Sequence, residues 1–179
     1  MSLYSDRKKY VLYLHPKEGT EEYSQFNNFW YHTSREYSDE IFNMIYHCSL
    51  SEFFETNDIS KLKRLLSDTI ESPVIINNIK PILDSNKYGF SFSSDQLKKY
   101  MNRISKYTDF IKSPSEISRN SLNFIKIHKN LEIILGHHNY KINPEADIFS
   151  HFNYKNWDRK WIVILWKIED GMWKIEWKN

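Results

Sequence analysis

The sequence contains few of the residues that mark several common protein classes. Its 179 residues include only four glycines, and these stand far apart in unrelated surroundings, at Gly19, Gly89, Gly136 and Gly171. A phosphate-binding loop needs clustered glycines, because backbone amides must approach the phosphate closely. We therefore expect no nucleotide-binding loop of this type, and we expect no cofactor.

Cysteine and long apolar segments are scarcer still. Cys48 is the one cysteine, which excludes a disulfide framework within the chain. Free cysteine is commonly buried, so we predict a structural thiol and not a nucleophile. No segment approaches the roughly 18 apolar residues that a membrane-spanning helix needs. The first residues also lack an apolar signal segment followed by a cleavage site. We expect a cytoplasmic protein with no membrane partner.

Apolar and aromatic residues, by contrast, are abundant. Aromatic residues make up 16% of the chain and apolar residues 40%, at a net charge of only +2. A disordered chain would have fewer apolar residues and a larger net charge. A chain of this length can bury one sizeable core but is short for two. We predict one globular domain over residues 1–179.

The order of apolar residues predicts a strand followed by a mainly helical middle. Residues 10–14 are β-branched or aromatic and end before Pro16, as in a short strand. Apolar spacing and end signals predict helices over 35–48, 59–70, 74–83, 95–111 and 114–135. Asp58 and Ser94 can cap two of these helices, and Gly136 can end the last, whereas Pro81 argues for a break in the third.

The end of the chain predicts a β-hairpin with strands 161–168 and 172–177. Asp170-Gly171 is a strong signal for the two-residue turn. In that register, one side of the ribbon would pair Ile168 with Trp173, Trp166 with Ile175 and Ile164 with Trp177. The other side would present Lys167, Lys174 and Glu176.

An isolated hairpin is marginal in water, so this one should pair with residues 10–14 and 140–142 and have helices on its apolar side. The predicted fold class is α+β, with a helical middle packed on a small antiparallel sheet that the C-terminal hairpin closes.

Charge is unevenly distributed along the chain. From Glu18 to Asp58, nine carboxylates oppose a single base, Arg35, which gives a net charge of −8. Helical spacing would place part of this charge on one solvent-facing stripe. The candidate partner-binding residues are Glu36, Asp39, Glu40, His47, Glu52 and Glu55. Glu21 and Glu22 could extend this surface. The same segment contains Phe26, Phe29, Trp30 and Tyr31, which are either core residues or an exposed binding cluster.

The profile of the whole chain resembles the immunity proteins of bacterial toxin–immunity pairs, especially those of contact-dependent growth inhibition. The chain is small, lacks catalytic motifs and is rich in Asn, Ile, Lys and aromatic residues. This resemblance implies a protein, not an enzyme, that binds and neutralises a cognate toxin. The acidic stripe would suit a cationic nuclease domain, whose cleft already attracts phosphates. Many immunity proteins to nucleases are acidic overall, whereas this chain has a net charge of +2.

Two alternatives remain open. A histidine-dependent hydrolase or nuclease could use His128, His137, His138 and His151, with Glu132, Glu145 or Asp147 nearby. None of these residues has a metal-binding spacing, so we expect no metal site. A nucleic-acid-associated module could use the basic helix 95–111, on which Lys98, Lys99, Arg103 and Lys106 form a stripe. A solvated helix face explains this stripe equally well, and we do not expect nucleic acid as the partner.

Overall fold

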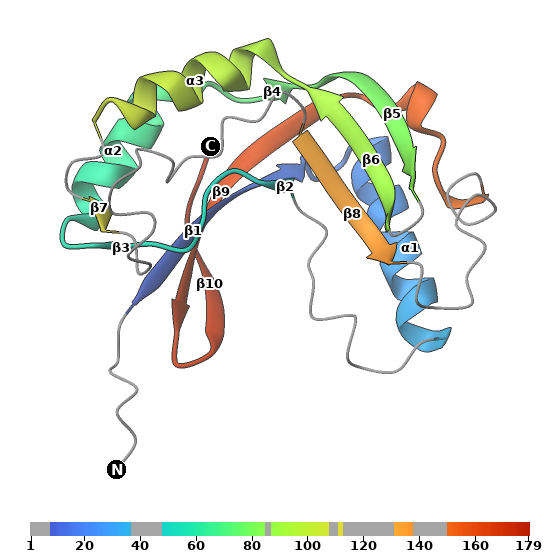
Figure 1. The fold of residues 1–179 in the computed structure, drawn as a ribbon, viewed down its shortest axis with the longest axis horizontal. Helices are drawn as coiled ribbons and strands as arrows, with labels where there is room; N and C mark the ends of the chain where they lie inside the picture. Colours follow the sequence, from blue (N-terminus) through green and yellow to red (C-terminus); the bar gives the residue numbers. More distant parts are fainter. Residues whose placement is uncertain (1–7, 37–47, 85–86, 108–110, 113–130, 138–149) are drawn as a thin grey trace.

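The predicted α+β class is confirmed. The structure, a computed structural model, describes residues 8–36, 48–84, 87–107, 111–112, 131–137 and 150–179. These residues form three α-helices, antiparallel sheets and a C-terminal hairpin (Figure 1). A short 3-10 helix, Tyr154–Asn156, precedes the hairpin.

The main sheet is built around β1 (Lys9–Pro16) and β9 (Lys160–Glu169). These strands pair along their length, from Lys9 opposite Ile168 to Pro16 opposite Trp161. β10 (Met172–Lys178) follows beyond β9, β2 (Cys48–Ser49) pairs with the other edge of β1, and β4 (Val74–Ile75) pairs with β9. The predicted pairing of the hairpin with residues 10–14 is confirmed. The predicted partner segment 140–142 lies outside the described residues.

The hairpin turn forms at Asp170-Gly171 as predicted. Both residues have positive φ, 53° and 74°, as a two-residue turn matched to strand twist requires. Ile168 lies opposite Trp173 and Trp166 opposite Ile175, also as predicted. The third predicted pair, Ile164 with Trp177, is wrong. A bulge between Ile175 and Trp177 places Trp177 opposite Leu165, and its indole N–H donates to Ser67 Oγ of the second helix at 2.9 Å.

A second, three-stranded sheet includes two segments that were predicted to be helical. It consists of β5 (Asn77–Leu83), β6 (Lys87–Ser93) and β8 (Leu131–His137). The predicted helix 74–83 is wrong, since β4 and β5 occupy it and Pro81 cannot donate within a helix. The predicted helix 114–135 is wrong at its end. Leu131, Ile133 and Leu135 alternate into the core with the period of a strand, and the rest of that helix lies outside the described residues.

The three helices are α1 (Glu21–Glu36), α2 (Ile59–Thr69) and α3 (Asp95–Ser105). The predicted caps are confirmed: Asp58 accepts from the Lys61 amide at 2.8 Å, and Ser94 accepts from the Leu97 amide at 3.2 Å. α3 ends before the predicted residue 111, because Ile111 belongs to β7 (Ile111–Lys112), which pairs with β3 (Glu55–Thr56).

The first predicted helix, 35–48, is confirmed at residues 35–36, which end α1, and is wrong at Cys48. Cys48 does not end a helix but pairs with Leu14 in the main sheet. The helical segment, α1, begins 14 residues earlier in the chain, at Glu21 instead of residue 35. Residues 37–47 lie outside the described residues.

The main sheet has two faces with different surroundings. Its inner face presents Leu12, Leu14, Trp161, Val163 and Leu165, all fully buried in one core with residues of α2, α3 and the second sheet. Its outer face presents the alternate residues, which lie directly opposite one another in the strand register. These are Val11, Tyr13, His15, Ile162, Ile164, Trp166, Trp173 and Ile175. Figure 1 shows α2 and α3 together near one end of the molecule, and α1 apart from them beside β6 and β8.

Candidate functional site

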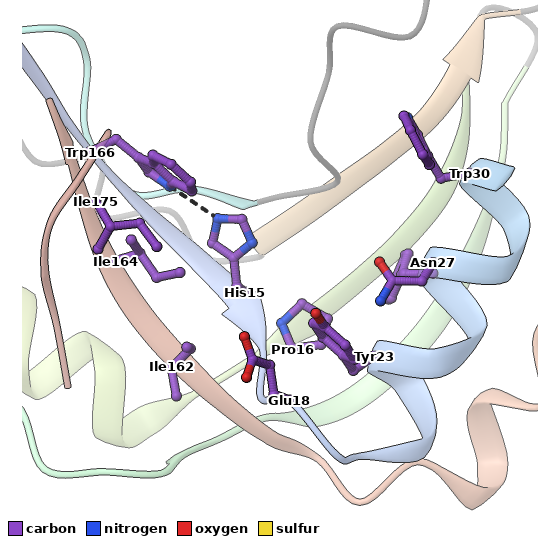
Figure 2. A pocket seen from close by; sticks show the side chains of 11 residues that line it. His15, Pro16, Glu18, Tyr23, Asn27, Trp30, Ile162, Ile164, Trp166 and Ile175 are labelled. Atoms are coloured by element: carbon purple, nitrogen blue, oxygen red, sulfur yellow. Dashed lines mark hydrogen bonds between the residues drawn. The ribbon is translucent and has the colours of Figure 1, made fainter. Parts of the chain in front are cut away.

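A pocket lies between α1 and the outer face of the main sheet (Figure 2). Its volume is about 320 Å³, which is within the range of small-ligand or anchor-residue pockets. The sheet contributes an apolar wall of isoleucines and one tryptophan: Ile162, Ile164, Trp166 and Ile175. The chain entering α1, together with α1 itself, contributes the polar side.

Three polar side chains on the α1 side of the pocket make no side-chain hydrogen bond with the described residues. Glu18 makes no ion pair or side-chain hydrogen bond with any described residue, and the same is true of the Asn27 amide and the Tyr23 hydroxyl. Glu18 is exposed and is the one carboxylate among the lining residues. An apolar pocket with a few convergent polar groups is the usual form of a binding site.

His15 closes the pocket on the β1 side. The Trp166 indole N–H donates to His15 Nε2 at 3.3 Å, as the dashed line in Figure 2 shows. A ring nitrogen that accepts a hydrogen bond has no proton of its own, so this contact requires the neutral imidazole with its proton on Nδ1. Among the described residues that line the pocket, Glu18 is therefore the one charged group in this arrangement.

Aromatic side chains continue from the pocket across the outer face. His15 contacts Trp166, Trp166 contacts Trp173, and Trp173 stacks on Tyr13 with 6.0 Å between ring centroids. Phe53 meets Trp173 edge to face at 6.1 Å. Burial in this cluster raises the pKa of Tyr13 to about 12, because the phenolate would lose its hydration.

Part of this cluster is open to solvent. Trp173 is 42% exposed, Phe53 41% and Ile175 50%. On α1, at the other side of the pocket, Trp30 is 42% exposed. We call Trp30, Phe53, Trp173 and Ile175 the aromatic patch. Contiguous exposed apolar groups of this kind mark interaction surfaces, whereas scattered single ones do not.

The sequence-predicted acidic residues are only partly within the described structure. Glu52 is exposed and directly precedes Phe53 of the aromatic patch, and Glu55 is half-buried in β3. Glu36 is the last residue of α1. Asp39, Glu40 and His47 lie outside the described residues. Of these six residues, the structure therefore describes the side chains of Glu52 and Glu55 alone, and Glu52 is next in sequence to the patch.

Glu22 does not belong to an acidic surface, contrary to its suggested role. It is fully buried, and its Oε2 accepts from the Asp158 amide at 2.9 Å. Oε1 has no hydrogen-bond partner. Burial raises the pKa of Glu22, since it disfavours the charged form more than the backbone hydrogen bonds favour it. Glu22 thus fastens α1 to the segment before β9, while its neighbour Glu21 remains exposed.

The aromatic residues of the acidic segment divide between core and surface. Phe26 and Phe29 are buried and pack on Phe152 at centroid distances of 5.0 and 5.2 Å. Trp30 and Tyr31 are exposed. The sequence left both possibilities open, and each holds for two of the four residues.

Of the four histidines named for a catalytic site, the structure describes the side chain of His151 and places His137 at the end of β8. His151 contacts the rings of Phe29 and His32, and Glu132 on β8 bonds to Lys87 at 2.6 Å. His128, His138, Glu145 and Asp147 lie outside the described residues. Cys48 is buried in the core. Lys98, Lys99, Arg103 and Lys106 are exposed, as a solvated face of α3 would have them.

The described residues also bear on metal binding and on membrane insertion. Among them, no group of three or more His, Cys, Asp or Glu side chains is placed to hold a metal ion. None of the described helices is long and apolar enough to cross a membrane. Compared with protein-family models, with curated proteins and with solved structures, the chain gives no match.

The pocket was not predicted, but the sequence contains a signal for it. The apolar side of the hairpin was predicted, with helices covering it. Successive residues of a strand point to opposite faces of its sheet, and β1 is apolar on both. Val11 and Tyr13 lie on one face and Leu12 and Leu14 on the other, so the sheet has two apolar faces. α2 packs on the inner side, and the outer side retains the exposed Trp173 and Ile175.

Proposed function

We propose that this protein is a binding protein that neutralises a cognate toxin, in the manner of an immunity protein. The observation that carries this proposal is the aromatic patch beside an open pocket. Exposed tryptophan and other aromatic side chains surrounding a concave site are typical of the energetic centre of a protein–protein interface. Their burial by a partner would remove a solvation penalty that the free protein carries.

Acidic residues at this surface support a cationic partner. Glu18 lies at the pocket, and Glu52 is next in sequence to Phe53. Rim charges mainly steer association and select partners, while central aromatic residues supply affinity. We therefore assign the main contacts to the aromatic patch and a steering role to the carboxylates. The expected toxin is a cationic nuclease domain.

The alternatives draw less support from the described residues. The hydrolase hypothesis needs histidines and a carboxylate in one cleft, yet His151 packs on aromatic rings and Glu132 is paired with Lys87. The nucleic-acid hypothesis needs further evidence of binding beside a basic stripe on one helix face.

The test begins with the genes beside this one. A large toxin gene directly upstream would supply the candidate toxin domain, which is then co-expressed and titrated with the purified protein. We expect protection of the host cell and a stable complex. Trp173→Ala should weaken the complex at least tenfold, the usual cost of removing a central tryptophan anchor. Tyr107→Ala is the matched control, because Tyr107 is an exposed aromatic residue at the end of α3, outside the pocket. Equal effects of the two substitutions, or no complex, would contradict the proposal.

A further inference from the structure

We propose that the pocket between α1 and the outer face binds the guanidinium group of an arginine side chain from the partner. This inference rests on the proposed function only for the source of the arginine. The chemistry of the pocket itself supports the guanidinium site.

The uncommitted polar groups of the pocket match a donor-rich ligand. The Glu18 carboxylate can only accept hydrogen bonds, and the Asn27 carbonyl and Tyr23 hydroxyl can accept them as well. The Trp166 N–H, a donor that could have served an anionic ligand, is already used by His15. A guanidinium offers five N–H donors and no acceptor, and it pairs with a carboxylate through two parallel bonds.

Charge and shape point the same way. Glu18 provides the one formal charge of the lining when His15 is neutral, so the pocket favours a cation. Trp30 and Trp166 present aromatic rings on which a planar guanidinium can stack. The isoleucine wall formed by Ile162, Ile164 and Ile175 suits the aliphatic stem of the side chain. Lysine would satisfy the charge but neither the fork geometry nor the stacking.

The experiment titrates the full-length protein with N-acetyl-arginine amide and follows the indole N–H signals by two-dimensional NMR. The neutral isostere N-acetyl-citrulline amide and the apolar N-acetyl-norleucine amide are the comparison ligands. We expect the arginine compound to shift the Trp30 and Trp166 signals. The citrulline compound should bind about fivefold more weakly, as expected for loss of a partly exposed ion pair.

Glu18→Gln should abolish the preference for arginine over citrulline. Glu21→Gln should keep it, because Glu21 is equally exposed but does not line the pocket. Equal binding of all three ligands, an unchanged preference in Glu18→Gln, or no binding at all would overturn the inference. If the arginine compound binds but the toxin domain does not, the proposed function fails while the site stands. If the toxin domain binds but the arginine compound does not, the arginine site fails while the proposed function stands.

Discussion

The two faces of the main sheet are made from the same strands but have different surroundings. On the inner face, Leu12, Leu14 and Leu165 are fully buried beneath helices and the second sheet. On the outer face, residues of β1 and β9 such as Tyr13 and Ile164 are also buried, whereas Trp173 and Ile175 of β10 remain about half exposed. Both faces are apolar, so hydrophobicity alone does not separate core from binding surface.

What separates them is β10, whose outer-face side chains Trp173 and Ile175 are left about half exposed. Apolar groups that the fold covers stabilise the folded state, whereas those left open can contribute only when a partner covers them. The inner face should therefore control stability, and the outer face should control binding. The predictions below test this division in order of expected effect.

The largest effect should come from the inner face. Leu14→Ala removes methyl groups from a fully buried site and should lower the free energy of unfolding by about 3 kcal/mol. Ile175→Ala, on the outer face at 50% exposure, should lower it by less than about 1 kcal/mol. Urea unfolding of the two variants measures both values. Similar losses would show that the outer face is also part of the stabilising core.

Alkaline pH should reveal the buried part of the outer face. The pKa of Tyr13 is raised from 10.0 to about 12, so the folded state keeps this proton where the unfolded state loses it. The stabilisation is fully present below pH 10 and is lost as the pH rises toward 12. Tyr13→Phe should flatten this part of the stability profile, measured by urea unfolding at several pH values. An unchanged profile in Tyr13→Phe would mean that Tyr13 is accessible to water.

A smaller effect should come from Glu22, the buried carboxyl of α1. The raised pKa of Glu22 means that protonation favours the folded state. The stabilisation from this proton is full below the ordinary pKa of 4.5 and is lost as the pH rises through the raised pKa. Glu22→Gln should stabilise the protein at neutral pH by on the order of 1 kcal/mol. The gain should vanish in mild acid. Thermal unfolding between mild acid and neutral pH measures this gain in stability, and Glu21→Gln is the exposed control. A loss of stability in Glu22→Gln at neutral pH would contradict the account.

Local signals in the sequence were reliable where they depend on a few neighbouring residues. The Asp58 and Ser94 caps and the Asp170-Gly171 turn all formed as predicted, because each depends on bonds or φ values within a short segment. The apolar side of the hairpin was also predicted, up to the bulge after Ile175.

Several predictions that depend on distant contacts failed, although the pairing of residues 10–14 with the hairpin is confirmed. Residues 74–83 and 131–135 have apolar spacings compatible with a helix. They form strands through pairing with distant segments: β4 with β9, and β5 and β8 with β6. α1 was missed because the buried face of its first turn includes Glu22, a carboxylate whose hydrogen bond to Asp158 is invisible in sequence. The pocket was missed for a related reason, since it joins His15, Trp30 and Trp166 from three separate segments.

Hydrogen exchange of the full-length protein, with and without the candidate toxin domain, tests most directly whether the outer face is the binding surface. The account predicts that the toxin protects the amides of β10 and of α1 around the pocket, while those of α3 with its exposed basic stripe exchange as before. Protection of α3 without protection of β10 and α1 would contradict it.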